Sequence, residues 1–209
     1  MKLYKIKFLI LALLTEFYSN NIFSMETFMG MTNLKDKNFD SLKIIGMSNL
    51  SNVIIKNNLE IIGATTFENN IKVNGKISIV GPVKINKSYI NTGKIVGSLK
   101  AVESDFANEL KVIGLVECSQ CNFKSEIEII SNKSIFTNSE LSTIKIMKNE
   151  NDGSDDSSKE NSTSVKKKQI LILKGNTKVN GDVIFEDQNS ELILDKNVKI
   201  SGKIIKGNV

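Results

Sequence analysis

Short segments with alternating apolar and polar positions recur along the chain at a nearly constant spacing. LKIIG begins at Leu42, LEIIG at Leu59, LKVIG at Leu110 and IEIIS at Ile127. The fifth position of six successive segments is occupied by Gly46, Gly63, Gly81, Gly97, Gly114 and Ser131. The intervals between these residues are 17, 18, 16, 17 and 17. A repeat of this length indicates one structural unit that is used many times.

Within each unit, the first and third positions are apolar and the second is polar. This period of two is typical of a strand with one buried face. The first column holds Leu42, Leu59, Ile77, Gly93, Leu110 and Ile127. The third column holds Ile44, Ile61, Ile79, Ile95, Val112 and Ile129. Glycine at the fifth position predicts a corner, because a residue without Cβ reaches positive φ at little cost.

Two further apolar positions complete the unit. The position four residues after the glycine holds Leu50, Phe67, Ile85, Ala101, Cys118 and Ile135. A position near the end of the unit holds Ile55, Ile90, Phe106 and Phe123. Each unit therefore predicts three short strands, separated by Asn, Ser and Gly residues that tolerate tight turns.

A unit of three short strands cannot bury its own apolar face, but stacked units bury a continuous core. We therefore predict an all-β fold, a parallel β-helix of about seven or eight rungs in all, spaced by the usual ~4.8 Å between strands, with residues 42–148 as its main part. Residues 25–41 are predicted to form an N-terminal cap or linker. An antiparallel sandwich is the alternative, but the nearly equal intervals disfavour it.

The fourth position of the unit is apolar as well. It is occupied by Ile45, Ile62, Val80, Val96, Ile113 and Ile130. In a regular strand this position faces away from the buried third column. Either the chain bends before the glycine and both columns point inward, or an apolar stripe runs along the outside. An exposed stripe would be a lateral packing surface, since continuous apolar surface usually has a partner.

Three segments lie outside this repeat. Residues 1–24 combine early lysines with a short apolar run, FLILALL, and predict a secretory signal and therefore export; an uncleaved membrane anchor is the alternative. Residues 149–169 are polar and low in complexity, which predicts a disordered insertion loop; its acids lack the spacing of a calcium-binding loop. Strand patterning resumes at Ile170, so residues 170–209 are predicted to form further rungs or a cap.

The amino-acid composition argues against several kinds of catalytic and binding site. The chain has no His, all 28 basic residues are Lys, and the formal net charge is +5. Without His, the usual general base and commonest metal ligand are missing, and no phosphate-binding glycine loop follows a strand. We therefore expect no catalytic residues, no cofactor and no metal. The lysines alternate with acids rather than forming a basic patch, so no nucleic-acid partner is expected.

The only two cysteines, Cys118 and Cys121, are separated by two residues. Cys118 shares the column of Leu50, and Cys121 matches Val53, Asn70, Ser88, Ser104 and Asn138. Free core thiols, a local disulfide, and a metal or redox site are all open. A disulfide needs a corner between the two residues, because three extended residues span about 10 Å and the Cα atoms must lie within about 7 Å. A closed zinc site needs four ligands.

The glycine-punctuated rungs, as in LKVIGLVECSQCNFKSE (110–126) and KVNGKISIVGPVKINKS (72–88), resemble bactofilin-type polymer-forming proteins. The resemblance covers residues 42–147 and 170–205 and concerns the style of the repeat. It implies a right-handed β-helix that self-associates, often end to end, without nucleotide. Two features depart from that family: bactofilins are cytoplasmic or bound to the inner side of the membrane, and the 149–169 insertion interrupts the rod.

These patterns lead to an expected function: an exported, non-enzymatic, self-assembling scaffold of the cell envelope or surface. Its expected end surfaces lie near Leu42 and in residues 192–205, and its membrane contact would be limited to an uncleaved signal segment. One alternative is an adhesin-like surface module for a glycan or a protein, although aromatic residues make up only 6% of the chain. A second alternative is a polysaccharide-active enzyme that uses paired carboxylates.

Overall fold

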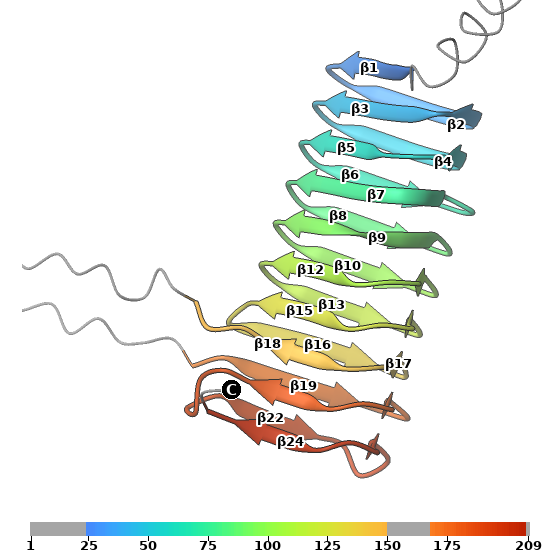
Figure 1. Ribbon diagram of the computed structural model, residues 1–209. Helices are drawn as coiled ribbons and strands as arrows, with labels where there is room; N and C mark the ends of the chain where they lie inside the picture. The colour runs from blue at the N-terminus through green and yellow to red at the C-terminus, as the bar shows by residue number, and fades with distance from the viewer. Residues whose placement is uncertain (1–23, 150–167, 208–209) are drawn as a thin grey trace, which may run out of the picture.

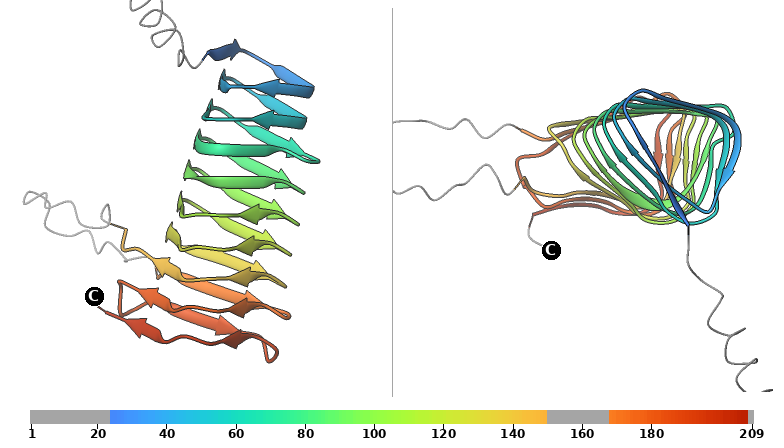
Figure 2. Two further views of the ribbon diagram at one scale, coloured as in Figure 1. Left: turned by 45° about the vertical axis from the view of Figure 1, so that its right-hand side comes forward. Right: turned by 90° about the horizontal axis from the view of Figure 1, so that it is seen from above.

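The structure, a computed structural model, describes residues 24–149 and 168–207 and is a parallel β-solenoid (Figure 1). The chain coils through about ten rungs with a spacing of about 17 residues. Seen from above, the rungs overlay one another around a common interior (Figure 2). The predicted all-β parallel fold is confirmed. The number of rungs is higher than predicted, because residues 25–41 form strands of the solenoid instead of a cap or linker. Residues after Ile170 continue the solenoid.

Each rung has three sides, and each side stacks in register on the same side of the next rung. The first face, which ends at the repeated glycines, contains β1 (Met25–Met29), β3 (Ser41–Ile45), β5 (Leu59–Ile62), β7 (Lys72–Val80), β9 (Tyr89–Val96), β12 (Leu110–Ile113), β15 (Ile127–Ile130), β18 (Ile144–Ile146), β21 (Val183–Phe185) and β24 (Ile204–Lys206).

The second face follows the glycine corner. It contains β2 (Thr32–Phe39), β4 (Ser48–Ile55), β6 (Thr65–Glu68), β8 (Val83–Asn86), β10 (Leu99–Val102), β13 (Val116–Ser119), β16 (Lys133–Thr137), β19 (Ile170–Lys174) and β22 (Glu191–Leu194). The third face contains β11 (Asp105–Phe106), β14 (Asn122–Phe123), β17 (Glu140–Leu141), β20 (Lys178–Val179) and β23 (Lys199–Ile200), together with parts of the longer strands β2, β4, β7 and β9.

The core consists of columns of apolar side chains that run the length of the rod. Leu42 lies against Leu59, which lies against Ile77, as the repeat predicted. Phe106 stacks on Phe123 with ring centroids 4.4 Å apart. Each fully buried aliphatic or aromatic side chain contributes about 1.5–3 kcal/mol. The column of Leu50 and Cys118 needs one correction: it continues to the buried Phe136, and Ile135 faces outward. One extra residue after the Ser131 corner, compared with the Gly114 corner, causes this shift.

The corner between the second and third faces is formed by residues in the left-handed conformation. Their φ values lie between 47° and 56°, and they are Asp36, Asn52, Asn70, Lys87, Glu103, Gln120 and Asn138. Asp and Asn adopt this conformation more readily than other residues with a side chain. Neighbouring corners are also joined, since the Asn52 Nδ2 donates to Asp36 Oδ1 over 3.0 Å.

Most of the predicted insertion, residues 149–169, lies outside the described residues, as does the predicted signal up to residue 23. The solenoid continues in register on both sides of the insertion, because β18 pairs with β15 and β21 while β19 pairs with β16. Gln169 Nε2 donates to the Met147 carbonyl over 2.8 Å and ties the two flanks together. In the part of the chain described, no helix is long and apolar enough to cross a membrane.

Candidate functional site

The apolar fourth column lies on the outside of the solenoid. Ile62 and Val80 are each 50% exposed, and Ile45, Val96, Ile113 and Ile130 are partly exposed. The interpretation in which both columns point inward is therefore wrong. Each strand keeps its alternation up to the corner, so Ile44 is buried and Ile45 is not, and the chain changes direction at the glycine itself.

The corner glycines stack directly on one another. We call Gly30, Gly46, Gly63, Gly81, Gly97 and Gly114 the glycine ladder. From Gly46 to Gly114, their φ values lie between 133° and 143°. A Cβ at Gly63 would overlap with the carbonyl oxygen of Gly46, and the same holds between later neighbours. From Gly46 to Gly114, glycine therefore allows the rungs to stack at this corner without a clash, as the fifth-position pattern predicted.

A second outward column, which the sequence reasoning missed, follows the glycines. It consists of Met31, Met47, Ala64, Pro82, Ser98 and Leu115. Its large members are well exposed: Met31 by 76%, Met47 by 55% and Leu115 by 41%. The members of this column recur at the same spacing of about 17 residues, but they share no single residue type. They could have been recognised in the sequence only by their position directly after each glycine.

The fourth column, the glycine ladder and this second column form one continuous surface, which we call the apolar ridge. Met29 extends its fourth column by one rung, because β1 pairs with β3 in register. Of the eleven large hydrophobic side chains that are exposed in the described residues, six lie on the ridge: Met29, Met31, Met47, Ile62, Val80 and Leu115. From Gly30 to Gly114 the ridge is about 24 Å long, at about 4.8 Å per rung.

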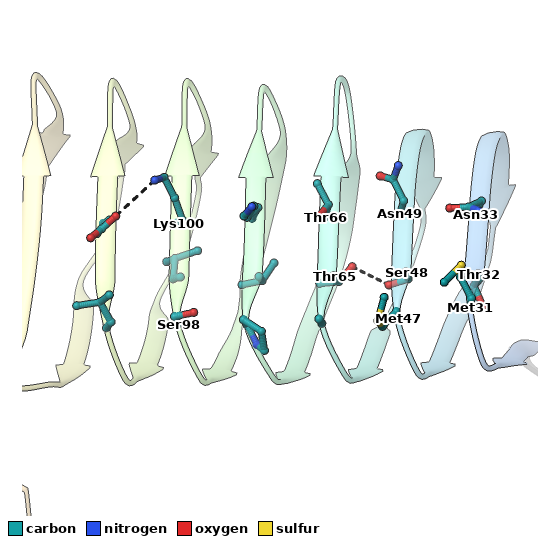
Figure 3. A pocket seen from close by; sticks show the side chains of 17 residues that line it. Met31, Thr32, Asn33, Met47, Ser48, Asn49, Thr65, Thr66, Ser98 and Lys100 are labelled. Atoms are coloured by element: carbon teal, nitrogen blue, oxygen red, sulfur yellow. Dashed lines mark hydrogen bonds and ion pairs between the residues drawn. The ribbon is translucent and has the colours of Figure 1, made fainter.

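One side of the ridge borders a shallow groove of about 480 Å³ (Figure 3). Met31, Met47 and Leu115 line its ends, and Ala64, Pro82 and Ser98 lie between them. Its far wall is polar and is formed by Asn33, Asn49, Thr66, Lys84, Lys100 and Glu117. The groove therefore has an apolar wall and a polar wall, both repeated along the rod.

Charges flank the ridge as pairs between neighbouring rungs. Lys43 Nζ lies 3.0 Å from Glu60 Oε2, and Lys111 Nζ lies 2.9 Å from Glu128 Oε2. The hydrogen bond to Glu128 raises the pKa of Lys111. Such surface pairs contribute at most about 1 kcal/mol each. Each of these pairs is locally neutral and lies beside the fourth column.

The two cysteines are free thiols in the solenoid interior, each 2% exposed. The Cys121 column corresponds to Ile71 and Ser139 rather than Asn70 and Asn138, because those asparagines occupy the left-handed corner. Burial raises the pKa of the Cys118 thiol well above its ordinary value, and the hydrogen bond with Cys118 lowers the pKa of Cys121. Among the described residues, no group of three or more metal-ligating side chains exists to complete a site around them.

No family model matches the chain, and searches of curated proteins and of solved structures found no match. The apolar ridge is therefore interpreted from its own geometry.

Proposed function

We propose that this protein is a non-enzymatic, self-assembling structural protein, exported to the cell envelope or surface, in which rods associate with one another. One observation carries the proposal: exposed apolar side chains are concentrated along the ridge instead of being scattered over the surface. Single exposed apolar residues are normal, but a contiguous stripe marks an interaction surface.

The geometry of the ridge suits a protein partner. A stiff solenoid holds its side chains at fixed spacing, so a complementary surface loses little conformational freedom when it docks. The glycine ladder adds a strip without side chains between the two outward columns. Another rod can therefore approach the backbone closely at the centre of the contact.

The ends of the rod offer a second kind of contact. The last described rung exposes Leu194 by 45% and Ile204 by 49%, at positions aligned with the buried Leu173 and Val183. An open sheet edge over an uncovered core can pair with another chain. This rung falls within the predicted end surface at residues 192–205. The other expected end surface, near Leu42, is instead covered by β1 and β2.

The bactofilin-like identity remains part of the proposal. The parallel β-solenoid supports membership of a class of β-helix repeat proteins, and the interaction surfaces described above are compatible with polymer formation. Export rests on the N-terminal segment, residues 1–24, of which only Ser24 is described.

Sedimentation velocity and electron microscopy of the purified chain test the proposal, with a second preparation that lacks residues 1–24. We expect species larger than a monomer in both preparations. Ile62→Lys should raise the apparent dissociation constant at least tenfold, because a lysine on the ridge must lose its hydration when the surface is covered. Ile54→Lys is the matched control, since Ile54 is 40% exposed but lies away from the ridge. Strictly monomeric wild-type protein at about 100 µM would contradict the proposal, since even weak specific interfaces are populated there.

A further inference from the structure

The apolar ridge changes in size along its length. In the column that follows the glycines, Met31 and Met47 are large, the next three residues, Ala64, Pro82 and Ser98, are small, and Leu115 is large again. The groove of about 480 Å³ follows this change, with the methionines at one end and the small residues along its middle. The ridge thus carries both a projection and a hollow, displaced from each other along the rod.

We infer that the partner of this ridge is a second copy of the same chain, docked antiparallel so that the methionine end of each rod fills the hollow of the other. This inference rests on the proposed function and adds the identity, direction and register of the partner. The direction and register follow from which side chains would face each other under each of the two possible twofold axes.

A twofold axis perpendicular to the rod reverses the order of rungs and places each column opposite the same column of the other copy. With the axis at Ala64, Met47 faces Pro82 and Met31 faces Ser98 of the second copy, while Ala64 faces itself. On both sides of the axis, large side chains then meet small ones, which suits the close packing that stable interfaces require. Because the surface is self-complementary, the contact closes as a dimer of ridges.

The fourth column fits the same arrangement. Reversal about Ile62 places Met29 opposite Val96 and Ile45 opposite Val80, so this column remains apolar throughout. The two columns therefore give the same register, although they lie on different faces of the solenoid.

The flanking charges are compatible with the antiparallel register. On the polar wall, Lys84 faces Asn49 and Lys100 faces Asn33 of the second copy. On the other flank, Lys94 faces Thr27 and Lys43 faces Ser78.

Glu60 is the flanking acid that meets its own copy across the axis. Its carboxylate carries the ion pair with Lys43 at 3.0 Å, which reduces the repulsion. No lysine on either flank of these five rungs faces another lysine.

A parallel arrangement fits poorly. A twofold axis along the rod places each rung opposite the same rung and brings the fourth column of one copy against the second column of the other. Met29, Met31 and Met47 of both copies would then crowd together at one end. The small residues Ala64, Pro82 and Ser98 would leave the other rungs apart, with their apolar surface still exposed.

Disulfide crosslinking tests the register. The background variant Cys118→Ala/Cys121→Ser replaces the native thiols with the residue types that occupy the same core columns at Ala101 and Ser104. In the full chain, Ala64→Cys alone should form a crosslinked dimer on mild oxidation. A mixture of Met47→Cys and Pro82→Cys chains should form a crosslinked pair with at least fivefold higher yield than either variant alone. Ile54→Cys, off the ridge, is the matched control and should give only background.

The parallel alternative has its own signature, because it would crosslink a mixture of Ile45→Cys and Met47→Cys chains. That result, or equal yields for Met47→Cys alone and for its mixture with Pro82→Cys, would overturn the antiparallel inference. If the background variant unfolds by circular dichroism, the same substitutions are made in the native sequence, whose two thiols are buried. Sedimentation of the wild-type chain separates the two levels of the proposal. If the chain self-associates but gives the crosslinks of the parallel arrangement, only the antiparallel inference is contradicted. If the chain is strictly monomeric, the proposed function is contradicted as well.

Discussion

At the scale of single residues, the stacking of rungs depends on glycines, which have no side chain at the corner. Each glycine of the ladder has a positive φ, and each from Gly46 onward lies so close to the preceding glycine that a Cβ would overlap with its carbonyl oxygen. Backbone conformation and close approach therefore impose the same requirement at the same position. This explains why glycine recurs in the five rungs from Gly46 to Gly114, although their sequences otherwise vary.

Gly97→Ala combines a positive φ with the close approach of the neighbouring rung, whereas Gly30→Ala meets only a positive φ. A Cβ at Gly97 would meet the Gly81 carbonyl, whereas a Cβ at Gly30 would meet nothing within 4 Å. We expect Gly97→Ala to lower the free energy of unfolding by about 3 kcal/mol, and Gly30→Ala by about 1 kcal/mol from its conformation alone. Urea denaturation measures both values. Equal losses for the two variants would show that close approach contributes nothing.

The two cysteines illustrate burial without a site. Their thiols lie inside the solenoid, and burial keeps Cys118 protonated at neutral pH, since it raises the pKa of that thiol. A thiolate is the reactive form, so both burial and protonation slow its reactions. We expect an aromatic disulfide reagent to label the native chain at least 100-fold more slowly than the chain in urea, as expected for thiols exposed only by opening. The denatured, unreduced chain should release two thiol equivalents, and zero equivalents would demonstrate a Cys118–Cys121 disulfide instead.

At the scale of strands and corners, the sequence predicted those features that follow from a shared residue type. The columns of Leu42 and Ile44 were predictable because nearly every rung repeats an apolar side chain there, with Gly93 as the exception in the first column. The column of Met31 was missed because its members are unrelated in type and are recognised only by their position after a glycine. The inward column was misassigned at Ile135, because one added residue reverses which side chains face the core.

The outward direction of Ile45 was open for a similar reason. Alternation alone predicts an outward-facing side chain, but isoleucine or valine facing outward in six successive rungs conflicts with the usual cost of exposing apolar surface. The position of the bend decides between the two interpretations, and that position depends on φ at Gly46 rather than on residue type. The conflict between local pattern and burial arises at the candidate interaction surface, where such conflicts are expected.

The pairing of strands around the 150–167 segment predicts that this segment is dispensable for the fold. β19 pairs with β16 and β21 pairs with β18, so both flanking rungs are held by contacts that do not involve it. Replacing residues 150–167 with a Gly/Ser linker of about eight residues should change the free energy of unfolding by less than about 1 kcal/mol, because loop-closure entropy varies slowly with length. Far-ultraviolet circular dichroism and urea denaturation would check this. A loss above about 3 kcal/mol would mean that the segment contributes structural contacts.

At the scale of the whole molecule, the ridge and the last rung are separate surfaces with different consequences for assembly. The ridge runs along the rod axis, so its contact places rods side by side. The last rung lies across the axis, so its contact lengthens the rod. Exposed apolar side chains occur at both places, with Ile62 on the ridge and Leu194 on the last rung.

Ile62→Lys and Leu194→Lys should therefore have distinct effects on assembly. Ile62→Lys should leave single rods that still lengthen end to end, because its lysine opposes only the side-by-side contact. Leu194→Lys should leave short paired rods, because a charge at an open sheet edge opposes further strand pairing. Electron microscopy would distinguish the two products by width and length, and circular dichroism would verify that both variants retain the solenoid. If either variant reduced the width and the length of the assemblies together, the prediction of two separate contacts, one along the rod and one at its end, would be wrong.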